Sequence, residues 1–500
     1  MFKKILISNR GEIAVRIIRT CLEMDIETVA IFSEADRISP HVLKAHEAYC
    51  VGPSPSSNSY LNMEKILDII KITGADAVHP GYGFLSENAD FSALISKEDA
   101  VWIGPPSSVI TIMGDKITAR KLAEKAGVPV LPGTIQPLQN LQIARETADK
   151  IGYPILIKAA GGGGGKGMRI VNSHSDLDNA MERAKSEATK SFADDRIYME
   201  KYLEEPHHIE IQVFADNHGN VVSLGERECS IQRRYQKIIE ETPSPFIDSK
   251  LRNNLSQSAI QITRSCKYIG AGTVEFLIDK DHNYYFLEMN TRIQVEHPIT
   301  EMVTGIDLVK EQIQVAAGEK LSFTQDDIQL TGHALECRVY AEDGFNNFSP
   351  SCGIIQEMTI PQGLGVRFDE GIRTGQEITH YYDSLLGKLI TWGDDRHTAI
   401  MRMCRALSEF QIAGIESTIP FCHMLLLHST FQKGEYSTFT LNNIKEDLLQ
   451  ELSTQRKDLN LAARIGAVKL HNQARPNFIP VSRKKSENQW IAAGRKDALV

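Results

Sequence analysis

TVEFLIDKDHNYYFLEMNTRIQVEHP, residues 273–298, is the stretch that decides the fold. Two runs rich in β-branched and aromatic residues flank the polar segment DKDHN, a pattern that predicts a β-hairpin. Across this turn Glu275 is expected roughly opposite Glu288, and Asn290 follows on the same face because side chains alternate along a strand. Two facing carboxylates repel each other unless cations lie between them.

Oxygen ligands of this kind suit Mg²⁺, the ion that a bound nucleotide carries. The hairpin therefore predicts a metal site made of Glu275, Glu288 and Asn290. A solvated acidic sheet face would also explain these residues, and the sequence leaves both interpretations open.

The polar residues that follow the hairpin also alternate. Arg292, Gln294 and Glu296 are separated by single apolar residues, so an extended chain would present all three on one face. An arginine fork and an amide match a small planar oxyanion, and a nearby glutamate can remove a proton from it. A surface strand is the alternative, but the neighbouring metal site favours anion binding.

A second unusual stretch is KAAGGGGGKGMR, residues 158–169. It is not a Walker A loop, because Ala160 stands where the first glycine belongs and Gly167 stands where Ser or Thr should hold Mg²⁺. Lys158 ends an apolar strand, where its charge needs a partner. The glycines predict either backbone phosphate contacts, from Gly163, Gly164 and Gly165, or a lid that closes over a ligand. A plain linker is the third possibility.

Composition and charge narrow the function classes. The chain has 500 residues, enough for about three domains. Its formal net charge of -9 gives no basic field for nucleic acid or a membrane surface. No apolar run reaches the ~18 residues of a membrane span, and MFKKILISNR is too short for a signal peptide. A cytoplasmic enzyme is expected.

The eight cysteines form no CxxC pair and are scattered along the chain, which indicates neither a disulfide framework nor a zinc site. Cys229 differs from the others because it lies in a stretch rich in Glu and Arg.

The sequence pattern changes along the chain and indicates separate regions. Strands and helices alternate before residue 115, which predicts an open parallel sheet. The loop NRGE there carries one glycine, a weak signal for a dinucleotide site. Residues after 331 are rich in short strands and turns. Residues 451–500 hold ten Lys or Arg against four Asp or Glu, so this segment carries +6 and the rest -15. The apolar spacing in this tail is typical of a helix, and a solvated, partly disordered tail is the alternative interpretation.

The motifs taken together resemble the ATP-grasp biotin carboxylases. The resemblance rests on SNRGEIAVRIIR, HPGYGFLSEN, the glycine run, EKYLEEPHHIEIQV, ERECSIQRRYQK, EMNTRIQVEHPITE, GHALECRVYAED and YYDSLLGKL, and covers residues 1–445. It implies a mixed α/β and α+β fold. The expected parts are an N-terminal αβ domain (1–114), an ATP-grasp domain (115–330) with a mobile lid at about 131–203, a mixed C-terminal domain (331–446) and a basic extension (447–500).

The resemblance also implies an ATP site with Mg²⁺ or Mn²⁺. Lys116, Lys158 and His208 would contact the phosphates, and Glu275, Glu288 and Asn290 would hold the metal. The residues implied for the adenine and the rest of the nucleotide are Glu200, Lys201, Leu203 and Gln232, with Gly163, Gly164 and Gly165 over the phosphates.

The second implied site takes bicarbonate and biotin. Lys237, Arg292, Gln294 and Val295 would hold bicarbonate, and Glu296 would be the general base. Arg338 would stabilise the biotin enolate and Tyr82 would border the biotin pocket. Bicarbonate activated in this way attacks ATP to give carboxyphosphate. Because water destroys carboxyphosphate, a lid made by the glycine run has a purpose.

Partners follow from the same resemblance. No Ala/Val-Met-Lys-Met biotinylation sequence is present, so biotin is expected on a separate biotin carboxyl carrier protein that works with a carboxyltransferase subunit. Arg19, Glu23 and Arg367 match the family's dimer interface and imply a homodimer. Tyr235 stands where the family more often has histidine, so the resemblance does not decide whether Tyr235 contacts the nucleotide.

The implied activity is the first half-reaction of an acyl-CoA carboxylase, acting on acetyl- or propionyl-CoA. A biotin carboxylase subunit of pyruvate carboxylase is the alternative. Another ATP-grasp ligase, such as a carbamoyl-phosphate enzyme, and a non-catalytic nucleotide-binding subunit complete the set of hypotheses.

Overall fold

The computed structural model describes residues 1–134, 136–160, 168–192, 194–344 and 346–473. Gly163, Gly164 and Gly165 lie outside the described residues, so the prediction made for them is not tested. Residues 1–449 form one compact unit and residues 450–500 belong to a second one.

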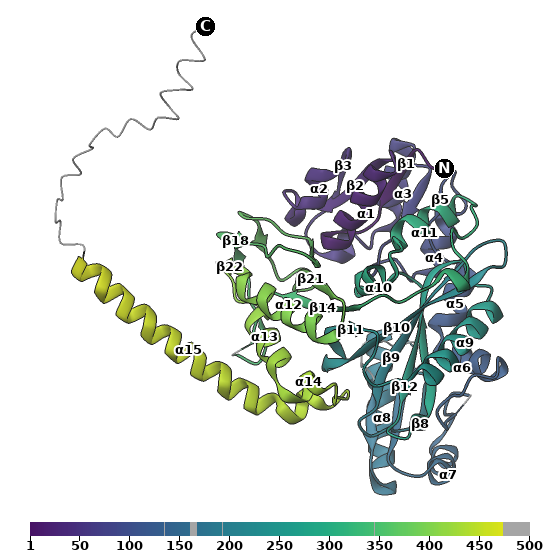
Figure 1. The fold of residues 1–500 in the computed structure, drawn as a ribbon. Coiled ribbons are helices and arrows are strands. Elements are labelled where there is room, and N and C mark those ends of the chain that lie inside the picture. The colour runs from purple at the N-terminus through teal and green to yellow at the C-terminus, as the bar shows by residue number, and fades with distance from the viewer. Residues whose placement is uncertain (135, 161–167, 193, 345, 474–500) are drawn as a thin grey trace. The chain divides into compact units, whose positions relative to one another are not determined.

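The N-terminal region contains a five-stranded sheet in the order β3-β2-β1-β4-β5, drawn in purple in Figure 1. Every neighbouring pair is parallel, which confirms the predicted open parallel sheet. The strands are β1 (Lys4–Ile7), β2 (Glu27–Ser33), β3 (Glu47–Gly52), β4 (Ala77–His79) and β5 (Val101–Trp102). The connecting helices are α1 (Gly11–Glu23), α2 (Pro40–Lys44), α3 (Met63–Thr73), α4 (Ala89–Ile95) and α5 (Ser107–Gly114), with 3-10 turns η1 (Glu34–Asp36) and η2 (Ser56–Asn58).

The central element is an eight-stranded sheet in the order β13-β12-β9-β10-β11-β14-β21-β19, whose neighbours are all antiparallel. Its strands are β9 (His207–Ala215), β10 (Val221–Arg233), β11 (Gln236–Thr242), β12 (Gly270–Ile278), β13 (Tyr284–Asn290), β14 (His333–Tyr340), β19 (Val366–Glu370) and β21 (Leu385–Gly393). The β12–β13 hairpin is the predicted one, and Glu275 pairs directly with Glu288. The helices in this part of the chain are α6 (Lys116–Lys125), α9 (Ser249–Ser265), α10 (His297–Thr304) and α11 (Leu308–Ala316).

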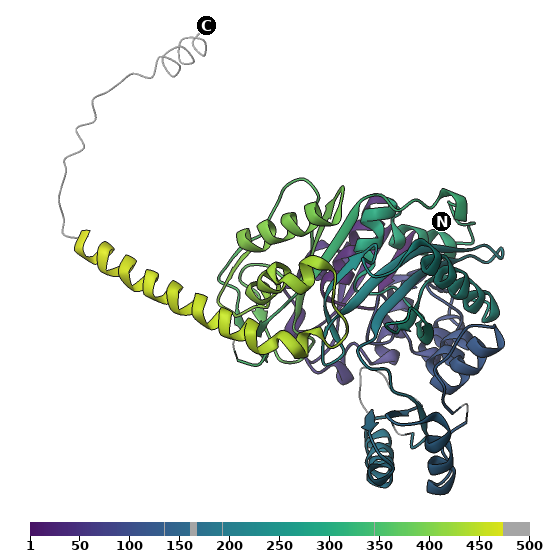
Figure 2. The ribbon, with the colours of Figure 1, turned by 60° about the horizontal axis from the view of Figure 1, so that its bottom comes forward.

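A smaller sheet, in the order β7-β6-β8, has a core of its own. Apolar residues such as Ile155, Leu177 and Met199 fill this core, and α7 and α8 pack on the sheet (Figure 2). The elements are β6 (Ile155–Ala159), β7 (Arg169–Val171), β8 (Ile197–Lys201), α7 (Leu141–Ile151), α8 (Leu177–Phe192) and η3 (His174–Asp176). They fall within the predicted lid range, 131–203.

The remaining elements are mostly short. They are α12 (Arg396–Glu409), α13 (Ile419–Leu427), α14 (Ser429–Lys433), α15 (Thr440–Gln473), η4 (Gln325–Asp327) and the strand pairs β15 (Glu342–Asp343) with β16 (Ser349–Pro350), β17 (Gly353–Ile354) with β20 (Glu377–Ile378), and β18 (Glu357–Thr359) with β22 (Gln411–Ala413). Among the described residues, no helix combines the length and the apolar character needed to cross a bilayer.

The expectation of an extended chain at 291–296 is wrong. β13 ends at Asn290, and the next residues form bends and turns before α10 begins at His297. The turn brings Gln294 and Glu296 back towards the sheet, where both side chains are buried. The alternating pattern favours a strand in this segment, but contacts with buried charged residues of the sheet outweigh that preference.

Gly371 marks a close approach between the central sheet and α1. A Cβ atom at this position would lie 2.5 Å from the backbone nitrogen of Glu12 and 3.0 Å from the carbonyl carbon of Gly11. These are backbone atoms, so relief requires the two elements to move apart.

The first prediction concerns this contact. Gly371→Ala should lower the free energy of unfolding by about 1–3 kcal/mol, the usual range for overpacking a close contact. Urea unfolding measures the change. Gly114→Ala is the matched control, because no atom lies within 4 Å of its added Cβ. Equal urea midpoints for the two variants would show that the contact at Gly371 is looser than described.

Candidate active site

The site begins with a row of charged residues across the central sheet. Glu288, Glu275, Glu210 and Arg227 occupy paired positions on β13, β12, β9 and β10. Directly paired residues on neighbouring strands project from the same face of a sheet. Three carboxyl groups and one guanidinium therefore line one face, and the excess negative charge calls for further cations.

Lys237, on β11, supplies one of them. Its Nζ lies 2.6 Å from Glu210 Oε2, 2.5 Å from Glu296 Oε1 and 3.4 Å from Glu275 Oε1. Burial alone would lower the pKa of Lys237, but Cys229 and the three glutamates raise this pKa well above its usual value. Lys237 therefore stays protonated and joins the sheet to the loop that carries Glu296.

Glu296 is held from two sides. Its Oε2 accepts a hydrogen bond from Arg338 Nη2 at 2.8 Å, and Arg338 Nε donates to Glu240 Oε1 at 2.6 Å. Burial would raise the pKa of Glu296, but Lys237, Arg338 and Arg227 outweigh it and hold this pKa well below the usual range. Glu296 is therefore ionised and able to accept a proton.

Arg227 organises the floor of the site. It is fully buried and donates to Glu210, to Gln212 (2.7 Å), to Thr300 (3.0 Å), to Thr273 (3.1 Å) and to Gln294 (2.7 Å). Because Arg227 holds the carbonyl oxygen of Gln294, the amide nitrogen of that side chain points at Glu275 Oε1, 2.9 Å away.

Glu275 accepts hydrogen bonds from Asn290 Nδ2 at 2.8 Å and from Gln294, and it pairs with His208 Nε2 at 3.0 Å. Burial would raise the pKa of Glu275, but Lys237 and His208 lower it well below the usual range. Gln232 Nε2 lies 2.9 Å from the other ring nitrogen of His208 and so fixes the ring. His208 and Gln232, both predicted to bind the nucleotide, thus belong to the same cluster as the predicted metal ligands.

The predicted phosphate-binding lysines have acidic partners. Lys116 Nζ lies 2.8 Å from Glu288 Oε2. Lys158, at the end of β6, pairs with Glu200, whose other oxygen accepts from Arg120 at 3.0 Å. Both lysines are thus positioned by carboxylates that an anionic ligand could replace as partners.

Glu200, described above, is predicted beside the adenine together with Lys201 and Leu203, and these two differ in their contacts. Lys201 Nζ donates to the carbonyl oxygens of Gly152 and Tyr153, each at 3.0 Å, and so joins β8 to the loop before β6. Leu203 is half-buried in the segment that follows β8.

Arg292 lies at the edge of the cluster. Its Nε lies 3.0 Å from Glu87 Oε2, and Nη2 donates to Asn290 Oδ1 at 3.2 Å. Tyr82 donates its hydroxyl proton to Glu12, which in turn lies 3.2 Å from Lys388 Nζ. Lys388 also donates to the backbone oxygen of Val295 at 2.7 Å, so Glu12 and Lys388 together connect Tyr82 to the predicted bicarbonate segment.

The donor chemistry fits a divalent cation. Glu275 and Glu288 lie side by side on neighbouring strands, and Asn290 follows on the same hairpin. Carboxylate and amide oxygens are the ligands that Mg²⁺ takes in proteins. Glu275, Glu288 and Asn290 would hold such an ion once the lysine and amide contacts described above give way.

Sequence reasoning missed several members of the cluster. Glu210 was detectable, because HHIEIQV puts it two residues after His208 on the same strand face. Arg227 and Glu240 become visible only when the register of β9, β10, β11 and β14 is known. Glu87 lies in the motif HPGYGFLSEN, but it is about 200 positions from Arg292 and Thr291, and nothing local predicted its contact with them.

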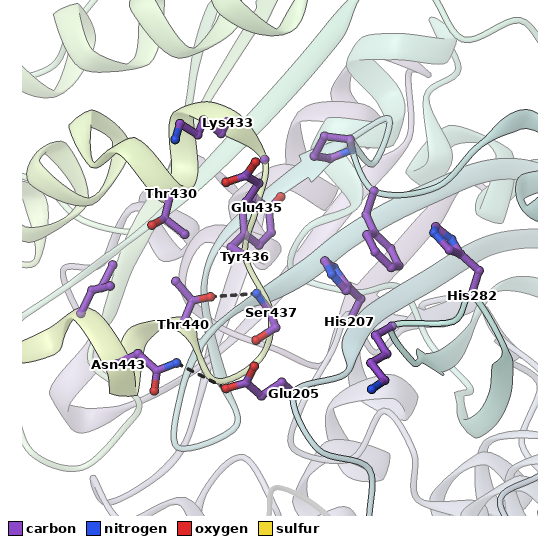
Figure 3. A pocket seen from close by; sticks show the side chains of 15 residues that line it. Glu205, His207, His282, Thr430, Lys433, Glu435, Tyr436, Ser437, Thr440 and Asn443 are labelled. Carbon is purple, nitrogen blue, oxygen red and sulfur yellow. Dashed lines mark hydrogen bonds between the residues drawn. The ribbon is translucent and has the colours of Figure 1, made fainter.

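A separate cavity of about 650 Å³ lies beside the start of β9 (Figure 3). The ring of Phe246 stacks between those of His207 and His282, at centroid distances of 3.5 and 4.7 Å. None of the predicted site residues lines this cavity. Tyr235 lies outside this cavity, in the β10–β11 turn, and is 58% exposed. Whether this residue contacts a nucleotide stays an open question of the sequence analysis.

The residues predicted for a dimer interface lie near the junction of α1 and β19. Arg19 Nη2 lies 3.0 Å from Glu370 Oε1, and Glu23 is exposed. Arg367 binds Asp369 at 2.7 Å and Glu301 at 2.8 Å. All eight cysteines are free, and Cys229 is buried beside Glu210 and Glu296.

Three family models match successive parts of the chain. The family model "Biotin carboxylase, N-terminal domain" matches residues 1–110, "Carbamoyl-phosphate synthase L chain, ATP binding domain" matches 115–324, and "Biotin carboxylase C-terminal domain" matches 336–443.

Two curated relatives and one solved structure illustrate the similarity. Biotin carboxylase 1 of Bacillus subtilis is 52% identical over 439 residues, 88% of this chain and 98% of the relative. The mitochondrial methylcrotonoyl-CoA carboxylase subunit alpha of Mus musculus is 46% identical over 516 residues, 99% of this chain and 72% of the relative. The biotin carboxylase domain dimer of Hydrogenobacter thermophilus 2-oxoglutarate carboxylase, in complex with MgADP, ADP and bicarbonate, is 45% identical with a TM-score of 0.87, over 90% of this chain and 99% of that one.

The second prediction concerns Arg227. Arg227→Lys keeps the charge but loses the planar fork, so several buried oxygens lose their donors. We expect a loss of about 3 kcal/mol in the free energy of unfolding, measured with urea. Arg405→Lys is the control, since Arg405 is exposed and its pairing with Glu409 should contribute less than about 1 kcal/mol. A loss at position 227 no greater than at 405 would contradict the role given to Arg227.

Proposed function

The chain belongs to the biotin carboxylase family of ATP-dependent ligases, and we propose that it is the biotin-carboxylating component of an acyl-CoA carboxylase. Its activity is the ATP- and bicarbonate-dependent carboxylation of biotin. The cofactors are ATP, Mg²⁺ and biotin presented on a carrier. The observation that carries the proposal is the contact of one buried lysine, Lys237, with Glu275 on the predicted metal side and Glu296 on the predicted bicarbonate side.

Bicarbonate would enter where Glu296, Arg292 and Gln294 meet. Arg292 and the amide of Gln294 would bind the anion, while the ionised Glu296 takes its proton. The contacts of Glu296 with Lys237 and Arg338 make it a weak base. We infer that bound bicarbonate takes over one of these two cations, which strengthens Glu296 as a base at the moment of proton transfer.

Phosphoryl transfer then depends on positioning. Lys116, Lys158 and His208 would hold the phosphates of ATP, and Glu200, Lys201, Leu203 and Gln232 would hold the rest of the nucleotide. Mg²⁺ held by Glu275, Glu288 and Asn290 would neutralise phosphate charge. The bicarbonate oxygen forms a bond to the γ-phosphorus as the bond to ADP breaks, and the product is carboxyphosphate.

Carboxyphosphate releases CO2 and phosphate, and the phosphate takes the proton from the ureido nitrogen of biotin. That nitrogen then attacks CO2. Arg338, always charged, would stabilise the anion on the ureido oxygen before the new C–N bond forms. Tyr82 would border the biotin ring. Gly163, Gly164 and Gly165 remain predicted lid residues that keep water from carboxyphosphate.

The partners follow from the relatives. A carrier bearing biotin would reach Arg338, and a carboxyltransferase subunit would pass the carboxyl group to an acyl-CoA. The alignment with the methylcrotonoyl-CoA carboxylase subunit spans 99% of this chain and thus includes the basic segment beyond residue 450, which supports an acyl-CoA rather than a keto acid as acceptor. A homodimer is supported by the dimer of the Hydrogenobacter domain. We place the enzyme in the cytoplasm.

The third prediction tests the assignment. The full chain should release ADP with free biotin and bicarbonate, and Glu296→Gln should lower kcat about 10²–10⁴-fold, the usual contribution of a general base. Arg338→Ala should abolish biotin carboxylation. The exposed Glu409→Gln is the control, with unchanged rates.

Wild-type rates in Glu296→Gln and Arg338→Ala would contradict the assignment. ADP release driven by ammonia or an amine, and indifferent to biotin, would instead identify a different ATP-grasp ligase.

A further inference from the structure

Two buried carboxyl groups face each other next to Arg338. Glu240 on β11 and Glu336 on β14 are directly paired in the sheet, and both residues are 0% exposed. Directly paired residues of an antiparallel sheet have Cβ atoms about 4.5–5.5 Å apart and side chains on the same face. The pair therefore places two acids together where water does not reach them.

Their hydrogen bonds are incomplete. Glu240 Oε1 accepts from Arg338 Nε at 2.6 Å. Within the part of the chain that the structure describes, Glu240 Oε2 and both oxygens of Glu336 have no hydrogen-bond partner. A buried carboxylate with no donor is costly, whereas a protonated carboxyl group supplies a donor of its own.

Lys388 and Arg338 act on Glu336 electrostatically, but burial outweighs them and neither forms an ion pair with it. Lys388 Nζ is directed at the backbone oxygen of Val295, at 2.7 Å, and at Glu12, at 3.2 Å, and lies 3.9 Å from Asp369. The described residues form no ion pair with Glu336. The ionisable groups that interact electrostatically with the pair, from all packed elements, are Tyr82, Cys229, Lys237, Glu296, Cys337, Arg338, Tyr340 and Lys388.

We propose that Glu240 and Glu336 share one proton at neutral pH, with Glu336 as the neutral member, and that Glu336 is a positioning residue that acts on Arg338 through Glu240. This inference rests on the proposed function for its catalytic consequence, but not for the proton itself. Burial supports it, since burial raises the pKa of Glu336 well above the usual value and that of Glu240 to about 7.

The consequence for Arg338 is electrostatic. Its guanidinium already touches two carboxylates, Glu240 and Glu296. A third negative charge, on Glu336, would leave the group unable to stabilise a new anion on biotin. One retained proton keeps the surroundings of Arg338 less negative and leaves Glu240 as a fixed acceptor for Nε.

The sign of the pH effect follows. A carboxyl group with a raised pKa loses its proton as pH rises, so activity in biotin carboxylation should fall on the alkaline side. Glutamine imitates the neutral carboxyl group in shape and cannot ionise. Glu336→Gln should therefore preserve the arrangement and move the alkaline limb to higher pH, whereas Glu336→Ala removes the neutral partner of Glu240 altogether.

The fourth prediction uses the full chain and two readouts. The first readout is kcat for free biotin, measured as a function of pH. The kcat of Glu336→Ala should be at least about tenfold below that of wild type, and Glu336→Gln should restore most of the loss. The alkaline limb of Glu336→Gln should move up by about one pH unit or more.

Infrared difference spectroscopy, wild type minus variant, tests the proton without any turnover. A carbonyl stretch of a buried protonated carboxyl group should disappear in Glu336→Gln. Glu311→Gln is the control, because Glu311 is also buried but both of its oxygens accept hydrogen bonds from Ser322, at 2.8 and 2.9 Å, and it should give no such difference.

Three results would overturn the proposal: no protonated-carboxyl signal lost with Glu336, an alkaline limb that stays in place in Glu336→Gln, or a glutamine variant as slow as the alanine variant. Failure of biotin carboxylation in the wild-type chain would refute the proposed function instead, and the infrared result would still decide whether the proton is there.

Discussion

The buried ammonium group of Lys237 is the interaction on which the rest of the site depends. It contacts Glu210 and Glu275, which come from the sheet, and Glu296, which comes from the loop before α10. Without this cation the three carboxylates would repel one another at low dielectric. Charge balance thus explains why a β-sheet with an acidic row holds an irregular loop against its face.

This balance also explains the chemistry. The cations that keep Glu296 ionised are the ones that bicarbonate would need in the proposed reaction, so substrate binding and activation of the proposed base would be coupled. Arg338 is shared in a similar way between Glu240 and Glu296. If the proposed assignment holds, a site built from exchangeable ion pairs would accept bicarbonate, ATP phosphates and a metal ion without leaving any charge unpaired.

Local pattern was enough to predict much of the fold. The N-terminal parallel sheet and the β12–β13 hairpin follow from alternation and turn chemistry, and the facing of Glu275 and Glu288 follows from the hairpin itself. The segment 291–296 was mispredicted because its alternation imitates a strand, while burial of Gln294 and Glu296 against Arg227 and Lys237 bends it. Glu240 and Glu336 were out of reach, since nearly 100 residues separate two acids that only sheet register brings together.

The central claim is that bicarbonate, activated at Glu296, attacks ATP. The most direct test gives the wild-type chain ¹⁸O-labelled bicarbonate, ATP and free biotin and determines the mass of the released phosphate. The mechanism requires that the attacking oxygen stays on phosphorus, so the phosphate should gain one labelled oxygen atom for each biotin carboxylated. Unlabelled phosphate released at the same rate as carboxybiotin would show that ATP is cleaved by water instead, and would contradict this account of the site.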